Sequence, residues 1–434
     1  MTTVFGGDEV NALVVDVGTS LCRAGYAGDD VPKAVFPSSV GVLPAEANGM
    51  EVDGAGPSKR KLYVGQSDVN YRRDNMEVVS PFSPTDDSFQ DWDMVEAIWD
   101  HAFRERLRVD PTEYAVLAAE ANVVPRAARE RVCEIMFEKL RVPALYLAKN
   151  AVLSAFATAR QTGLVVDAGY RGTTVAAVHD GYVLQKSVCK LPVGGQLLNT
   201  LMQKALEGRG FSFKPRYQIK RVERLPGEFS VETLQLPNTT PSFHNFQVEA
   251  LVADVREALA KVNDVPYDEA AHAQLPTVQY ELPDGQEILV GADRLKVPEV
   301  YFQPGLLSSF PNLPAESIPR RADGSQLSRL QDVVVESINK CDVDVRKDLY
   351  QGVILTGGVS GTTGLRDRLE RELAERGPNA ARIKVTMPAN PIERRFSVWI
   401  GGSILSSLGS FQQMWMSKKE YEEHGAGLIH RKAP

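Results

Sequence analysis

The sequence predicts an α/β fold made of two related domains that face each other across a cleft. One short phrase occurs twice, as LVVDVGTS at 13–20 and as LVVDAGYRGTT at 164–174. Each copy is a β-branched apolar run typical of a buried strand, then an aspartate (Asp16 or Asp167), then a turn of glycine and hydroxyl residues. The elements predicted between the copies fit an α/β domain that is duplicated in sequence.

Those elements follow from periodicity and turn signals. Between the copies we expect a return strand at 21–27, helices at 91–107, 125–140 and 148–160, and a strand at 114–118. After the second copy we expect a helix at 246–262, a hairpin of 278–281 and 287–290, a strand at 352–356, and helices at 364–376 and 403–408. Three stretches with little periodicity are predicted to be inserted loops, at 43–61, 214–241 and 306–329.

The repeated turns indicate a phosphate ligand. Glycine and hydroxyl residues permit a tight turn that directs backbone N–H groups at an anion. Two such turns could grip a polyphosphate from both sides, and Asp16 and Asp167 could hold a hydrated Mg²⁺ against it. A single copy would be an ordinary strand ending in a turn, so the matching pair carries the prediction. Gly357 and Gly358, after a third β-type run, are a weaker signal for a flat ligand on bare backbone.

Length and composition narrow the class of protein. A chain of 434 residues is too long for one typical core, so two or more domains are expected. The net charge of −7 argues against general DNA binding as the main task, although a local basic patch stays open. Four well-separated cysteines, no signal peptide and no long apolar run predict free thiols in the cytosol or nucleus.

Several common catalytic motifs are missing from the sequence. It contains no G-x-x-x-x-G-K-[ST] loop, no H-E-x-x-H and no G-x-S-x-G. The six histidines are scattered, and none pairs at metal-ligand spacing. These absences argue against a P-loop enzyme, a zinc protease and a serine hydrolase.

Three segments resemble the actin family. Residues 24–38 are similar to the amino terminus of actin, residues 341–350 to its third subdomain, and residues 396–421 (FSVWIGGSILSSLGSFQQMWMSKKEY) to its carboxyl end. The resemblance covers almost the whole chain. The phrases at 6–10, 179–185 and 391–396 resemble a nuclear class of actin-related proteins, and the three insertions fit that class better than actin.

The resemblance implies the actin/Hsp70/sugar-kinase fold, with two RNase H-like domains around a nucleotide cleft. Domain I would comprise residues 1–151 and 398–434 (subdomains 1 and 2), and domain II residues 152–397 (subdomains 3 and 4). The ligand would be ATP with Mg²⁺, or alternatively Ca²⁺, held through water by Asp16 and Asp167. By motif match, the nucleotide-binding residues would be Asp16, Gly18, Thr19, Ser20, Leu21, Arg23, Asp167, Gly169, Tyr170, Arg171, Gly172, Thr173, Arg256, Glu257, Gly357, Gly358, Val359 and Arg395.

Two positions depart from actin where water would attack the nucleotide. Asn150 stands where actin has the glutamine that places the water, and Thr174 where actin has the histidine that helps to deprotonate it. The second turn also gains Tyr170 and Arg171 and loses an acidic residue. Hydrolysis needs an in-line water and a route for its proton, so we expect ATP binding without significant hydrolysis and assign no catalytic residue. An active actin-like ATPase and a filament-forming actin are the alternatives.

The resemblance also implies partners. The nuclear class pairs with actin on a helicase-SANT-associated (HSA) helix in chromatin remodelling and histone acetyltransferase complexes, which serve transcription regulation and DNA repair. Histones or nucleosomal DNA are further candidates. No membrane association is expected, and no filaments, because 43–61 replaces a filament-contacting loop of actin. Four apolar residues near the carboxyl end, together with Phe156, either pack in the core or line a groove for a partner helix, and spacing leaves both open; the four are Ile404, Leu405, Leu408 and Met414.

Overall fold

Two six-stranded sheets form the framework of the computed structural model, which describes residues 11–44, 60–84, 86–225, 228–314, 318–320, 324–377 and 382–434. The β1 sheet has the order β19-β8-β7-β1-β2-β3. Its strands are β1 (Ala12–Val17), β2 (Leu21–Tyr26), β3 (Ala34–Pro37), β7 (Ala115–Glu120), β8 (Ala144–Lys149) and β19 (Met416–Ser417). A small sheet continues from β3, with strands β4 (Val40–Leu43), β5 (Lys61–Tyr63) and β6 (Glu77–Val79).

The β9 sheet repeats the plan of the β1 sheet. Its order is β11-β10-β9-β17-β18, and β12 also pairs with β10. Just as β1 lies antiparallel to β2 and parallel to β7, β9 lies antiparallel to β10 and parallel to β17. The strands are β9 (Gly163–Ala168), β10 (Thr173–His179), β11 (Tyr182–Val183), β12 (Cys189–Leu191), β17 (Val353–Thr356) and β18 (Val385–Thr386). The duplication seen in the sequence is thus a duplication of sheet topology. The exact domain boundaries remain a prediction.

Helices cover each sheet, and each sheet has a separate apolar core. Around the β1 sheet lie α1 (Gln66–Asn70), α2 (Trp92–Asp100), α3 (Arg126–Glu134), α14 (Lys418–His424) and α15 (Ile429–Lys432). The second half has α5 (Gly195–Glu207), α6 (Pro241–Leu259), α7 (Glu269–His272), α8 (Asp293–Glu299), α9 (Leu330–Asn339), α10 (Val343–Gln351), α11 (Leu365–Arg376) and α12 (Pro391–Arg395). No helix in the described part of the chain is long and apolar enough to span a bilayer.

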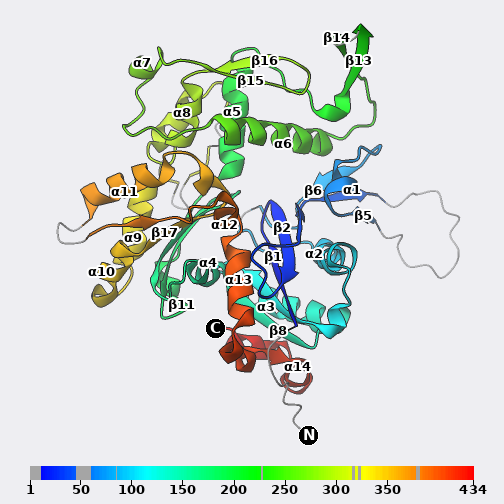
Figure 1. Cartoon of the computed structure of the whole chain (residues 1–434), viewed down its shortest axis with the longest axis vertical. Helices are drawn as coiled ribbons and strands as arrows, with labels where there is room; N and C mark the ends of the chain where they lie inside the picture. Colours follow the sequence, from blue (N-terminus) through cyan, green and yellow to red (C-terminus); the bar gives the residue numbers. More distant parts are fainter. Residues whose placement is uncertain are drawn as a thin grey trace, which may run out of the picture.

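Helices α4 (Asn150–Ala157) and α13 (Ser397–Ser407) pack closely together between the two halves (Figure 1). Gly401 permits this contact, because a Cβ there would overlap the carbonyl oxygen of Leu153. Trp399, fully buried in α13, donates its indole N–H to the carbonyl oxygen of Val14 in β1 (3.0 Å). The central helix is therefore fixed to the strand that leads into the first turn.

Most predicted elements are confirmed, and some boundaries were wrong. The hairpin at 278–281 and 287–290 is β15 (Val278–Glu281) with β16 (Glu287–Val290), and the 364–376 helix is α11. The expected 148–160 helix begins only at Asn150, because β8 continues to Lys149. The expected 403–408 helix begins six residues earlier, at Ser397, and runs through Gly401.

The predicted insertions differ in structure. The 214–241 stretch, expected to be a loop, forms a hairpin of β13 (Ile219–Leu225) and β14 (Glu228–Thr233). The described part of 306–329 continues the 3₁₀ turn Pro304–Ser309 and ends where α9 begins. Within 43–61, residues 45–59 lie outside the described part of the chain.

Candidate functional site

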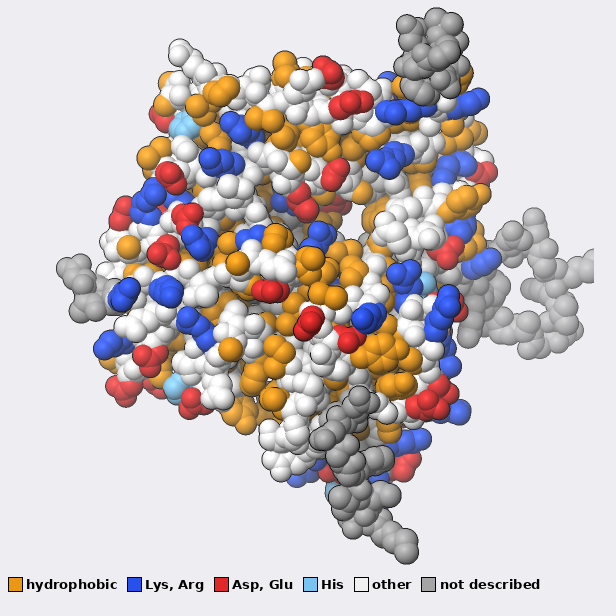
Figure 2. All heavy atoms as spheres, viewed as in Figure 1, with side chains coloured by type: hydrophobic (Ala, Val, Ile, Leu, Met, Phe, Trp, Pro, Cys, Tyr) orange, Lys and Arg blue, Asp and Glu red, His pale blue; other side chains and the backbone are white. Residues whose placement is uncertain are grey.

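Residues of both sheets line one pocket of about 810 Å³. Every residue assigned to the nucleotide by motif match contributes to its lining, and so do Asn150 and Thr174. The space-filling view shows a hollow between the upper and lower parts of the molecule on this face (Figure 2). A volume of this size is typical of a pocket for a small-molecule ligand.

The two repeated turns close in the same way. The N–H of Gly18 donates to the carbonyl oxygen of Leu21 at 3.0 Å, and the N–H of Gly169 donates to that of Gly172 at 3.0 Å. Each bond joins residues three apart, so two residues form each tip. The tips are Thr19 with Ser20, and Tyr170 with Arg171.

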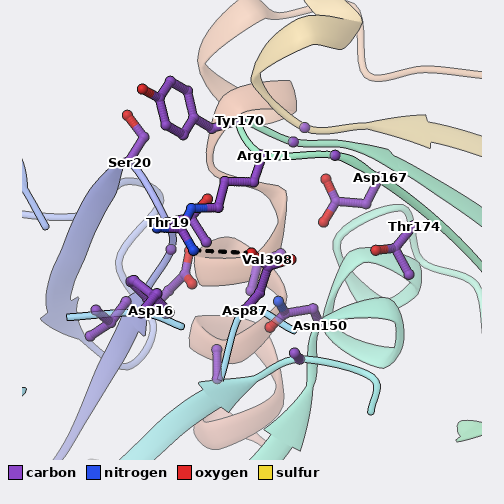
Figure 3. Close-up of a pocket in the computed structure, with 18 of the residues that line it drawn as sticks. Asp16, Thr19, Ser20, Asp87, Asn150, Asp167, Tyr170, Arg171, Thr174 and Val398 are labelled. Atoms are coloured by element: carbon purple, nitrogen blue, oxygen red, sulfur yellow. Dashed lines mark hydrogen bonds and ion pairs between the residues drawn. The ribbon is translucent and has the colours of Figure 1, made fainter. Parts of the chain in front are cut away.

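Strand register places the two aspartates at equivalent positions, but with different neighbours. Asp16 in β1 lies opposite Arg23 in β2, and their side chains form an ion pair of 2.6 Å. Asp167 in β9 lies opposite Thr174 in β10, which carries no charge. Figure 3 shows Asp16 and Asp167 on opposite sides of the pocket, with Asn150 between and below them.

This difference leaves one carboxylate without its own counter-charge. Burial raises the pKa of Asp167 to about 6, the Asp16 charge adds to the effect, and Arg23 opposes it. A carboxylate that is costly to ionise is relieved by a cation placed beside it. Mg²⁺ prefers carboxylate and water oxygens, so the pair fits a hydrated Mg²⁺ held near Asp167.

Glycines bring bare backbone against this carboxylate. Gly357, at the end of β17, has φ +91°, and a Cβ there would overlap both Asp167 Oδ1 and the carbonyl oxygen of Ala168. At Gly358, which lines the pocket, a Cβ would meet open space. The predicted platform for a flat ligand is consistent with this geometry, because no side chain projects from Gly358.

Some predicted ligands turn their side-chain groups away from the pocket. Thr173 donates its hydroxyl to the carbonyl oxygen of Val193 at 2.8 Å, and Tyr170 donates its hydroxyl to Glu249 on α6. Arg395 Nη1 lies 3.9 Å from Glu257 Oε2, and both of these pocket-lining side chains are about half exposed. Thr173 and Tyr170 therefore offer backbone rather than hydroxyl groups to a ligand.

A protein-family model described as Actin matches residues 7–434. The chain belongs to the actin family. It is similar to Actin-related protein 4 of Oryza sativa subsp. indica, with 50% identity over 451 residues that cover 99% of this chain and 100% of the relative. Actin-related protein 4 of Arabidopsis thaliana is 49% identical over 450 residues, with the same coverage. That of Yarrowia lipolytica is 38% identical over 433 residues, which cover 99% of this chain and 97% of the relative. The resemblance to actin is confirmed, and the two sheets are those of the actin fold.

The two positions that were expected to differ from actin both line the pocket. Thr174 lines it opposite Asp167, and Asn150 lines it from the first residue of α4. The Oδ1 atom of Asn150 is buried and has no hydrogen-bond partner among the residues that the structure describes. A buried polar atom of this kind commonly binds water, so Asn150 can still hold a water molecule.

Sequence reasoning missed the segment that follows β6. Arg171, at the tip of the second turn, donates to the carbonyl oxygen of Ser83 at 2.6 Å and to Ser80 Oγ at 3.0 Å, and pairs with Asp87 at 3.3 Å. Lys190 donates to the carbonyl oxygen of Asp86 at 3.1 Å. No motif marks these residues, because the contact joins positions about ninety apart in sequence.

The five residues predicted to line a partner groove differ in exposure. Ile404 and Leu408 are each 40% exposed, whereas Leu405 is only 9% exposed and packs in an apolar cluster with Trp399. Phe156 and Met414 are partly buried against the same cluster. Residues 404 and 408 are one helical turn apart, while 405 is rotated by about 100° toward the core. Leu405 therefore exposes little surface to a partner helix, and its place in the groove stays a prediction.

Proposed function

We propose that this chain is a nuclear actin-related scaffold subunit that binds ATP without significant hydrolysis. In this proposal it pairs with actin on an HSA helix in chromatin remodelling and histone acetyltransferase complexes. The similarity to proteins named Actin-related protein 4 supports the class of protein. ATP bound between the two halves would stabilise the folded protein.

The asymmetry of the two aspartates carries the nucleotide part of the proposal. Asp16 is neutralised by Arg23, whereas Asp167 faces an uncharged threonine across the strand pair. Mg²⁺, or alternatively Ca²⁺, would neutralise the phosphate charge and Asp167 together. The matched turns would present their tips to the phosphates, and Gly358 would leave room for the nucleoside.

Two residues of the same pocket support the proposal that the bound ATP is hydrolysed slowly or not at all. Asn150 can hold a water molecule through its unpartnered Oδ1, but its side chain is one methylene shorter than glutamine. Thr174 is a poor proton acceptor. Water that is bound but neither placed in line nor deprotonated gives little turnover.

Exposed apolar side chains on α13 support the partner proposal. Ile404 in α13 and Leu408, the residue directly after the helix, are four positions apart and are each 40% exposed. Phe156 and Met414 lie partly buried beside the same apolar cluster. An amphipathic helix with apolar residues at matching spacing would cover this face.

Two measurements separate the candidate functions. The purified protein is loaded with Mg·ATP, freed of excess nucleotide, and its bound nucleotide is identified by chromatography over several hours. We expect about one bound triphosphate per chain that persists. Rapid conversion to diphosphate would favour the active ATPase, and pelleting of the protein in polymerising salt would favour a filament-forming actin. A protein that retains no nucleotide would contradict the scaffold proposal.

A further inference from the structure

Seven basic side chains line the pocket, and they differ in how far their charge is already paired. Four of them form ion pairs with acidic residues that also line the pocket: Arg23 with Asp16, Arg171 with Asp87, and both Arg256 and Arg395 with Glu257. The other three, Lys190, Arg320 and Arg394, form no ion pair with a residue that the structure describes. A triphosphate carries more negative charge than one Mg²⁺ neutralises, so unpaired positive charge in its pocket is available to it.

Of these three residues, only Arg320 belongs to one of the predicted insertions, at 306–329. Lys190 lies in β12 and Arg394 in α12, which are both regular elements of the fold. Arg320 is exposed, and its guanidinium donates to the carbonyl oxygen of Gly324 at 3.5 Å, which is longer than usual for an N–H···O bond. Its charged group is therefore only weakly held by the protein itself.

Apolar contacts anchor the insertion on both sides of Arg320. Before it, Phe310 is 6% exposed and Ile318 is partly buried, and both pack in the apolar core around the β9 sheet. After it, Leu327 is 7% exposed in the same core. Because Ile318 lies only two positions before Arg320, the backbone of Arg320 is held beside the pocket, while its long side chain can turn toward a ligand.

We infer that Arg320 is a nucleotide-binding residue contributed by the insertion, and that its guanidinium pairs with the phosphates of ATP. This inference rests on the proposed binding of ATP. A guanidinium is planar and always charged, and it offers parallel N–H donors that match the oxygens of a phosphate group. An exposed cation at the pocket also attracts an anionic ligand from solution. The insertion would thus add a ligand contact that the motifs shared with actin do not include.

The affinity of the whole chain for nucleotide tests this inference. Wild type, Arg320→Ala and Arg320→Lys are freed of nucleotide and titrated with Mg·ATP at low and at high salt. At low salt we expect Arg320→Ala to bind roughly fivefold more weakly, because an exposed charged pair contributes up to about that factor. Arg320→Lys keeps the charge and should keep most of the affinity. The difference between wild type and Arg320→Ala should shrink at high salt, which screens exposed charges.

Arg329→Ala is the matched control. Arg329 is an exposed arginine at the end of the same insertion, pairs with Asp332 at 2.8 Å, and is not among the residues that line the pocket. Its removal should leave the affinity for Mg·ATP unchanged. Urea unfolding without nucleotide should be the same for all variants, since Arg320 and Arg329 are both exposed.

Two outcomes would overturn the inference and leave the proposed function intact. One is wild-type affinity in Arg320→Ala. The other is a loss of affinity that salt does not reduce and that Arg320→Lys does not restore, because such a loss would not come from pairing with phosphate charge. Failure of wild type itself to bind Mg·ATP would overturn the proposed function, and the role of Arg320 with it.

Discussion

Replacing each aspartate by asparagine should separate a structural carboxylate from one kept for a ligand. In the nucleotide-free protein, Asp16→Asn removes the charged partner of the partly buried Arg23 guanidinium, with which Asp16 forms a 2.6 Å ion pair. A hydrogen bond to a charged group contributes about 2 kcal/mol, so we expect Asp16→Asn to lower the free energy of unfolding by about that amount.

Asp167→Asn should act in the opposite direction. The difference between a pKa of about 6 and the ordinary 3.8 corresponds to at most roughly 3 kcal/mol of unfavourable ionisation in the folded state. Because the folded protein keeps this proton to higher pH than the unfolded chain, the carboxyl lowers stability as pH rises from about 4 to 6, and the full cost persists above 6. At pH 8, Asp167→Asn should therefore be neutral or stabilising.

Mg·ATP should reverse the order. A ligand at a thousand times its Kd stabilises the folded state by about 4 kcal/mol, and a variant that binds it poorly forfeits much of that gain. Urea unfolding of wild type, Asp16→Asn and Asp167→Asn, with and without Mg·ATP, measures the free energy of unfolding of each protein and its gain on nucleotide binding. If Asp167→Asn destabilised the nucleotide-free protein as much as Asp16→Asn does, Asp167 would be an ordinary structural residue and the argument from register would fail.

The remaining predictions concern the partner face, the central helix pair, one buried ion pair and the thiols. Leu408→Asp should weaken capture of an HSA-type helix by about 2 kcal/mol in a titration, whereas Val343→Asp, on the exposed start of α10, should leave it unchanged. Gly401→Ala should lower the free energy of unfolding by about 3 kcal/mol or more, because its Cβ would overlap the α4 backbone; a smaller loss in urea would mean that α4 can move. Glu299→Ala should lower the free energy of unfolding in urea by about 3 kcal/mol, since the fully buried Arg368 loses its 3.1 Å partner and keeps only Glu372 at 2.9 Å as an ion-pair partner, and Glu299→Gln should cost less. All four cysteines are buried thiols outside any disulfide, so a thiol reagent should label four sites only after denaturation, and fast labelling of the native protein would contradict this burial.

Local patterns in the sequence predicted much of the fold. The repeated apolar runs, the Pro283-Asp284-Gly285 turn and the leucine stripe of α11 each depend on neighbours within a few residues. The start of α13 was missed because two adjacent glycines look like a helix break. Close packing on α4 compensates there for their low helix propensity.

Contacts between distant segments set the limit on predicting the site. Composition and spacing located the two turns, but nothing near Arg171 in sequence indicates that it binds residues 80–87. Helical rotation likewise decides that Ile404 is exposed and Leu405 buried. Spacing along one helix could not decide this, because which face meets the core depends on where the helix packs.

The asymmetry of the aspartates, by contrast, was already present in the sequence. Arg23 follows Asp16 by seven positions (23 − 16), and Thr174 follows Asp167 by seven (174 − 167). Both hairpins have a turn closed by a hydrogen bond between residues three apart. In each hairpin, the residue seven positions after the aspartate therefore lies opposite it. Aligning the two phrases therefore pairs one aspartate with a cation and the other with a neutral hydroxyl. That comparison points to Asp167 as the carboxylate that requires a cation from outside the chain.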